Sequence, residues 1–208
     1  MRPVGNFENV LEAARDWTRR MHAEQDQTWG DGRPYSDHLA AVESVLLRFG
    51  FSDPTNPTHQ NLRLAALAHG LLKKTPVRPE TIRALLGPDV LDLVQGLTES
   101  PWATVLKLSV RIAAIEDPPQ WLIPHQRDAC QEVSEDLLEP LIQPGTPAEH
   151  LWEHLASLLA SAGSQAPSGP IPAAPQPPAP TITETTAAAP MVPTVPTGAV
   201  AILPEPWF

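Results

Sequence analysis

The feature that most constrains this chain is an abrupt change of composition near residue 163. Up to about Ala162, apolar and charged residues alternate with helical spacing. Beyond Gly163 there is no Lys or Arg, and 12 of the last 46 residues are Pro. Such a composition cannot bury enough apolar surface to offset the entropy lost on ordering. We therefore predict a helical domain at residues 1–162 and a Pro/Ala/Thr-rich disordered tail, partly polyproline II, at residues 163–208.

Helical periodicity dominates the first part, which we assign to the all-α class with about eight helices. Asn6 is predicted to cap the first helix, Gly50 to stop the second, and Pro79 and Gly87 to bracket a short one. Polar loops are expected at residues 25–36 and 52–58. We find no period-2 strand. The helices are expected at residues 7–21, 39–49, 62–72, 79–87, 88–97, 102–115, 129–142 and 147–160.

Charge and cysteine content exclude several classes of protein. The net charge is -10, and every acidic residue except Glu184 and Glu205 precedes the tail. An acidic domain of this kind argues against a nucleic-acid partner. Cys130 is the only cysteine, so no internal disulfide can form. No segment has the ~20 apolar residues of a membrane span, nor the apolar core of a signal peptide. A cytoplasmic protein without a membrane partner is expected.

Four short segments occur in the order and spacing of one known family. Residues 31–38 (DGRPYSDH) contain G-x-P-Y-x-x-H, and residues 64–75 (LAALAHGLLKKT) lie over the pattern AALLHDVVEDT. Residues 82–98 match I…FG-x-EV-x-x-LV-x-GVT, and residues 107–111 (KLSVR) fall where KLADR belongs. Over residues 7 to about 115 the chain thus resembles the RelA/SpoT-type alarmone hydrolases of the HD superfamily. The resemblance implies an HD-type helical bundle.

In that family two His and two Asp hold a divalent ion, typically manganese, which activates a water for hydrolysis. His38 and His69 match the two His ligands. Gly70 and Val110 stand where the resemblance places the two Asp ligands, and neither has an oxygen to donate. Lys73 and Lys74 replace a Glu-Asp pair that assists proton transfer. We therefore predict no catalytic residue, at most a vestigial metal site at His38 and His69, and no cofactor.

The same substitutions give the predicted site a positive charge. Lys is a competent partner for phosphate, so an ammonium in the region of the lost metal would make an anion-binding pocket. A guanine nucleotide or a protein is the expected partner of such a pocket. The alternative is that the pair is solvated at a helix end, where cations are favoured. The predicted anion-binding residues are Lys73, Lys74, Arg33, Tyr35, Lys107 and Arg111.

Two further motifs carry weaker signals. His150, Glu153 and His154 match the metalloprotease pattern H-x-x-E-H, but a carboxylate ligand downstream is required and only the tail follows. We reject protease function. Trp207 and Phe208 end the tail and are candidates for docking into a partner's pocket, unless the chain simply stops there.

The sequence is compatible with three functional hypotheses. The first is a catalytically inactive HD-domain protein that binds a ligand or a protein. The second is an active metal-dependent phosphohydrolase whose metal is held by His38, His69 and an unaligned acid such as Asp37 or Glu116. The third is a purely structural interaction module whose old pocket has filled with side chains.

Overall fold

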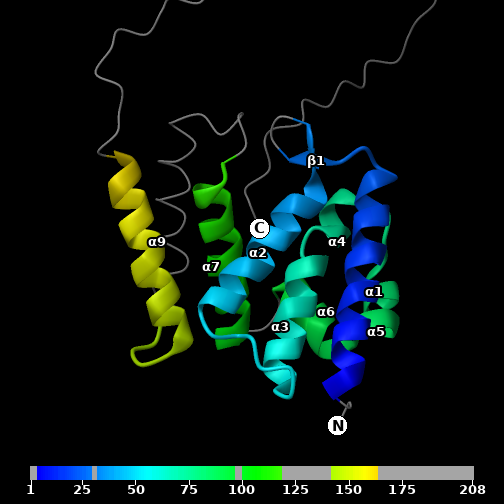
Figure 1. Cartoon of the computed structure of the whole chain (residues 1–208), viewed down its shortest axis with the longest axis horizontal. Coiled ribbons are helices and arrows are strands. Elements are labelled where there is room, and N and C mark those ends of the chain that lie inside the picture. Colours follow the sequence, from blue (N-terminus) through cyan, green and yellow to red (C-terminus); the bar gives the residue numbers. More distant parts are fainter. Residues whose placement is uncertain (1–3, 30–31, 97–99, 119–141, 164–208) are drawn as a thin grey trace, which may run out of the picture. The chain divides into compact units, whose positions relative to one another are not determined.

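The computed structural model describes residues 4–29, 32–96, 100–118 and 142–163 (Figure 1). All of them belong to one compact unit, Met1–Pro167, while a second unit, Ser168–Phe208, lies outside the described residues. The predicted tail, Trp207, Phe208, Cys130 and nearly all of the helix expected at residues 129–142 also fall outside them. Within the described part the architecture is helical, which confirms the all-α class.

The first third of the unit carries two long helices and a minimal hairpin. Helix α1 (Val4–Ala23) is followed by strands β1 (Thr28–Trp29) and β2 (Arg33–Pro34), which pair antiparallel with Trp29 opposite Arg33. Helix α2 (Tyr35–Arg48) begins directly after β2, because Pro34 takes the N-cap position with φ -57° and leaves Tyr35 as the first helical residue. The prediction of a loop over residues 25–36 is therefore wrong in part, because this range contains β1, β2 and the first two residues of α2.

The predicted cap of the first helix is also wrong. Asn6 lies inside α1, which begins at Val4. A cap residue is worth only about 1 kcal/mol, and no Pro stands between Val4 and Asn6 to stop the helix from propagating. The signal from a single cap residue was too weak to locate this end of the helix.

Helix α3 (Pro57–Ala68) lies at the centre of the unit, and every residue from Leu62 to Ala68 is buried. Asn56 caps it by accepting a hydrogen bond of 2.9 Å from the backbone N–H of Thr58. The predicted helix at residues 62–72 divides after Ala68, and the short α4 (Leu71–Lys74) follows across His69 and Gly70. The division allows residues at the α3–α4 junction to face α1 and α2.

The remaining helices begin and end close to the residues that the sequence predicts. Pro opens α5 (Pro79–Leu86), α6 (Pro88–Gln95), α7 (Pro101–Glu116) and α9 (Pro147–Gly163). Gly96 ends α6 in the left-handed conformation with φ 62°, so the helix stops before the predicted Leu97. Helix α7 packs against α2 and α9, and α3 packs against α1, α2 and α6 (Figure 1).

The described core is largely apolar, but a buried ion-pair cluster lies within it. The Glu43 carboxylate on α2 accepts hydrogen bonds from Arg15 on α1 at 2.8 Å and from Arg63 Nε on α3 at 3.1 Å, and a second guanidinium nitrogen of Arg63 lies 3.0 Å from it. Arg63 also donates to Glu8 at 3.1 Å and lies over the ring of Phe7. These bonds tie α1, α2 and α3 together through charge.

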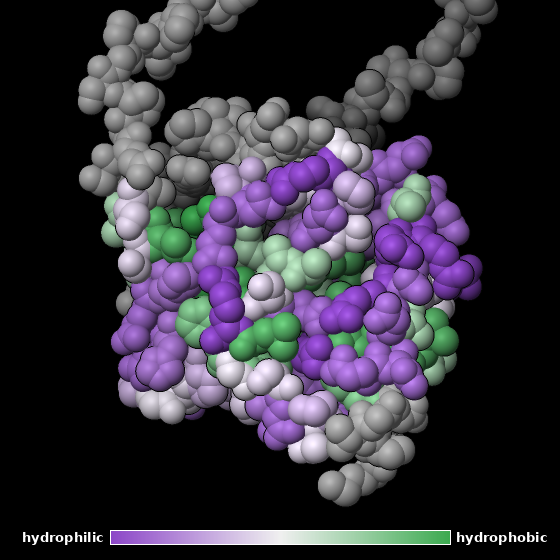
Figure 2. Space-filling view, in the orientation of Figure 1, coloured by the Kyte–Doolittle hydropathy of each residue, from purple (hydrophilic) through white to green (hydrophobic). Residues whose placement is uncertain are grey.

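On the face shown in Figure 2, hydrophilic side chains predominate and hydrophobic ones form small separate patches. None of the described helices combines the length and the apolar character that crossing a membrane requires.

Candidate functional site

The two predicted His ligands lie together where four elements meet. His38 is in the second turn of α2, and His69 follows the last residue of α3. Their ring centroids are 5.2 Å apart in an edge-to-face arrangement. His22 comes from the end of α1 and Trp29 from β1, and both are buried. We call His22, Trp29, Tyr35, His38 and His69 the ring cluster.

Aromatic contacts hold the members of the ring cluster in place. Trp29 stacks on His38 with a centroid distance of 3.9 Å and an interplanar angle of 12°. The centroid of the Tyr35 ring lies 4.5 Å from that of His22 and 5.5 Å from that of His38. The Trp29 indole N–H donates to the carbonyl oxygen of Asp117 at 3.1 Å, which ties β1 to the end of α7. The cluster is thus packed ring against ring.

Gly70 is the position at which the resemblance places a ligand Asp, and other side chains occupy the space beside it. A Cβ built on Gly70 would lie 2.8 Å from the Tyr35 ring, 3.1 Å from its hydroxyl and 3.2 Å from His22. A distance of 2.8 Å is inside van der Waals contact, so even Ala would force Tyr35 to move. The space that a side chain at position 70 would enter is therefore occupied by Tyr35 and His22.

The imidazoles of the ring cluster have few hydrogen bonds. His69 Nδ1 donates to the Ala66 carbonyl oxygen at 2.7 Å, which leaves Nε2 as the lone-pair nitrogen. Within the described part of the chain, His69 Nε2, His38 Nδ1 and both nitrogens of His22 are buried without a hydrogen-bond partner. Unpaired buried polar atoms cost free energy, so the packing of the rings has to offset this cost.

Burial keeps these histidines neutral. It is the largest cause that lowers the pKa of His22 to about 4, that of His38 to about 2 and that of His69 to about 4, from an ordinary 6.5. Repulsion by the Lys74 ammonium lowers all three further. Burial also raises the pKa of the Tyr35 hydroxyl. The cluster is uncharged at neutral pH.

Lys74 is a predicted anion-binding residue that the structure does bring to Tyr35. Its Nζ lies 5.2 Å from the centroid of the Tyr35 ring, although the residue is exposed. Lys73 is exposed beside it. Arg33 binds Asp117 with two hydrogen bonds, of 2.7 and 3.1 Å. Lys74 thus approaches the ring cluster, whereas Arg33 is paired with Asp117.

Two further residues of the predicted set lie on α7. Lys107 lies against Gly96 at the end of α6, and Arg111 is buried. Val110, at the second Asp position of the resemblance, is half-buried and packs against the apolar core.

Neither acid proposed as a replacement ligand joins the two imidazoles. Glu116 accepts hydrogen bonds from Arg48 at 2.5 and 3.0 Å and contacts His154 at 3.0 Å. Asp37 is exposed on α2. Among residues 4–29, 32–96, 100–118 and 142–163, no three His, Cys, Asp or Glu side chains are grouped so as to hold a metal.

The H-x-x-E-H motif has a separate role on α9. His154 pairs with Glu116 of α7 and packs 5.5 Å from the Phe49 ring, while His150 lies 3.5 Å from Glu153. The two His thus have different partners.

Sequence reasoning missed His22 and Trp29. Phe7, Leu11, Ala14 and Thr18 are buried at helical spacing along α1, and His22 continues the same face. That periodicity was the signal that could have placed His22 inside. Trp29 gave no such signal, because it lies in a segment read as a polar loop.

Comparison with known proteins settles the family. The HD domain matches residues 14–119, which is more than half of the chain. This chain belongs to the HD-domain family. Comparison with curated proteins finds no match. Among solved structures, the fold is similar to that of a metazoan ortholog of SpoT that hydrolyzes ppGpp and plays a role in starvation responses.

That structural similarity has a TM-score of 0.57 and covers 76% of this chain and 97% of the metazoan chain. Only 19% of the residues are identical, so the likeness concerns the fold. Together, the family match and the fold confirm the resemblance to the HD superfamily that the four sequence segments indicated.

Proposed function

We propose that this protein is a catalytically inactive HD-domain protein that acts by binding a partner protein. The observation that carries the proposal is the contact around Gly70, where Tyr35 and His22 occupy the space beside the missing carboxylate. Manganese favours carboxylate and water oxygens, and the ring cluster offers only neutral imidazoles and a nearby ammonium. These residues do not fit a manganese ion. We therefore expect no metal-assisted hydrolysis at this site.

A protein partner is favoured over a nucleotide because the ring cluster is packed. Trp29 stacks on His38, and Tyr35 lies against Gly70. The rings therefore contact one another instead of facing an open cleft. Two cavities of the described surface, of about 250 and 280 Å³, are lined by other residues. Binding outside the family's old pocket is thus the simpler expectation.

The test is incubation of the pure protein with guanosine tetraphosphate and manganese, following both nucleotide binding and pyrophosphate release. We expect no release above the protein-free background. Turnover that is lost on His69→Ala, together with stoichiometric manganese binding, would instead establish the enzyme hypothesis. Absence of any partner, with hydrolysis also absent, would favour a purely structural module.

A second candidate, an anion site at Lys74, is favoured by one observation. Its ammonium lies over Tyr35, next to the residues that hold the metal in the family. Lys74→Gln should then weaken nucleotide binding, while Lys73→Gln, which removes the same charge from the exposed neighbour, should not. Equal responses of the two variants would exclude a specific anion site there.

A further inference from the structure

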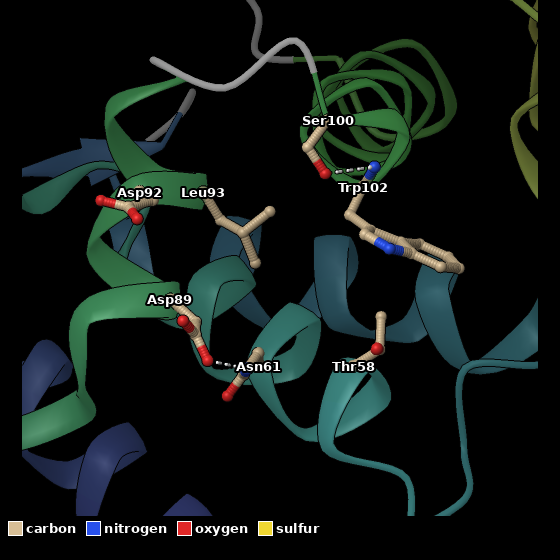
Figure 3. A pocket seen from close by; sticks show the side chains of 7 residues that line it. All are labelled: Thr58, Asn61, Asp89, Asp92, Leu93, Ser100 and Trp102. Carbon is tan, nitrogen blue, oxygen red and sulfur yellow. Dashed lines mark hydrogen bonds between the residues drawn. The ribbon is translucent and has the colours of Figure 1, made fainter.

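A cavity of about 250 Å³ lies between α3, α6 and the start of α7, away from the ring cluster (Figure 3). It is open to solvent, because each lining side chain is half-buried or exposed. Its volume is below the roughly 300–1,000 Å³ typical of small-molecule pockets, so it suits a single long side chain. The residues that shape it are Thr58, Asn61, Asp89, Asp92, Leu93 and Trp102.

The two sides of this cavity differ in chemistry. Figure 3 shows the indole of Trp102 on one side, above Thr58, and the carboxylates of α6 on the other. The Trp102 ring makes an edge-to-face contact with Phe51 at a centroid distance of 6.2 Å, and the Trp102 backbone N–H donates to Ser100 Oγ. The cavity thus combines an aromatic wall with an anionic one.

The carboxylates of the anionic wall have no cationic partner in the described part of the chain. Asp89 accepts one hydrogen bond, of 3.2 Å, from the Asn61 amide, and Asp92 takes part in no ion pair there. The first-turn position of Asp89 suits the dipole of α6, but Asp92 lies a turn further on. Their charge is available to a ligand.

The second cavity, of about 280 Å³, provides a contrast on the same molecule. It is also lined by acids, but most of its charges are matched: Arg19 pairs with Asp16 at 2.7 Å and Arg15 contacts Glu12 and Glu43, whereas Asp37 takes part in no ion pair in the described part of the chain. An internally paired surface gains little from an added cation. Only the first of these two cavities presents unpaired carboxylates beside an aromatic face.

We propose that the cavity at Trp102 binds an arginine side chain of a basic partner protein, an inference that rests on the proposed function. A guanidinium stacks on aromatic faces, is weakly hydrated and pairs with carboxylates in a planar fork. Asp89 and Asp92 supply the carboxylates, Trp102 supplies the face, and Leu93 contacts the aliphatic stem. The net charge of -10 steers a basic partner toward the molecule.

The test measures the binding of a fluorescein-labelled nona-arginine peptide to the full chain by fluorescence anisotropy. The double variant Asp89→Asn, Asp92→Asn should weaken binding at least about tenfold, because it removes both carboxylates of the cavity. The matched control is Glu24→Gln with Asp26→Asn. It removes two exposed acids just after α1, and Asn suits the left-handed residue 26 with its φ of 50°. It should change binding less than about twofold.

The aromatic wall is tested separately. Trp102→Leu should weaken binding of the arginine peptide about three- to tenfold, and Trp102→Phe should restore most of it. Circular dichroism of each variant checks that it folds. If Trp102→Leu does not fold, the phenylalanine and asparagine variants still decide the outcome. Equal affinity for nona-lysine would overturn the assignment to arginine.

Equal weakening by the two acid pairs, or no binding by the unmodified chain, would overturn the cavity proposal. Either result would leave the absence of catalysis untouched. Conversely, release of pyrophosphate from guanosine tetraphosphate would overturn the proposed function without altering the peptide result.

Discussion

Helices α1, α2 and α3 bury polar side chains at two places that differ in how those side chains are paired. At one place, Glu43 accepts hydrogen bonds from Arg15 and Arg63, so each buried charge has an opposite charge beside it. At the other, in the ring cluster, His22 and His38 are buried without a carboxylate. At these two places, the buried groups that keep a charge are those with an opposite charge beside them.

The buried histidines of the ring cluster carry no charge. Without the carboxylates and the metal that the family places there, protonated imidazoles would be isolated charges in an apolar environment. Burial therefore holds them neutral, and stacking against Trp29 and Tyr35 replaces coordination as the interaction that positions them. Gly70 has no side chain, and this absence leaves the space that Tyr35 and His22 occupy.

The most damaging change should be at the paired cluster. Glu43→Gln keeps the shape but removes the charge that compensates Arg15 and buried Arg63, and we expect a loss of about 3–5 kcal/mol in the free energy of unfolding. Urea denaturation measures it. Glu24→Gln, the same chemical change at an exposed site just after α1, should alter it by less than about 0.5 kcal/mol. Similar losses in both variants would mean that pairing is not what distinguishes the site.

The next largest effect should come from restoring the family residue. Gly70→Asp puts a Cβ 2.8 Å from Tyr35 and a carboxylate among rings, so we expect a loss of about 2–3 kcal/mol and no gain of manganese binding. Thermal unfolding with and without manganese checks both. Ala40→Asp, at an exposed site on α2, is the control. Stabilisation of Gly70→Asp by the metal would show that the site can still be rebuilt.

Acid should lower the free energy of unfolding through the buried histidines of the ring cluster. The unfolded histidines titrate near 6.5 and His22 in the folded chain has a pKa of about 4, so the unfolded state binds more protons between these values. Stability is thus full above pH 6.5 and falls as the pH drops toward 4, by about 2 kcal/mol for His22 between pH 7 and pH 5. His22→Phe should reduce that pH dependence, whereas His150→Phe, at an exposed site, should not. An unchanged slope in His22→Phe would place the titration elsewhere.

Much of the fold could be predicted because its signals are local. Pro at the first position of α5, α6 and α7 and Gly after α5 and α6 mark helix ends through backbone geometry alone. The start of α1 could not be placed from Asn6, because one cap residue contributes too little to decide it. The hairpin of β1 and β2 has only two residues in each strand, too few for an alternating pattern to appear.

The site was less predictable because it depends on contacts between distant segments. His38 and His69 could be found from motif spacing, and they do lie together. That Tyr35 would occupy the space beside Gly70 could not be read from spacing, since it requires the relative position of two helices. Arg33 was predicted to face an anion but binds Asp117, a residue 84 positions away.

The smallest expected effect concerns an exposed ion pair that joins α2 to α7. Arg48 and Glu116 form two hydrogen bonds, with side chains 46% and 28% exposed, against 4% for buried Glu43. Water already solvates such charges, so the coupling energy of the pair in a double-mutant cycle of Arg48→Gln and Glu116→Gln should be about 0.2–1 kcal/mol. High salt should reduce it further, because exposed charges are screened. A coupling comparable to that of Arg63 with Glu43 would mean that geometry, rather than burial, sets the strength of charge pairing in this domain.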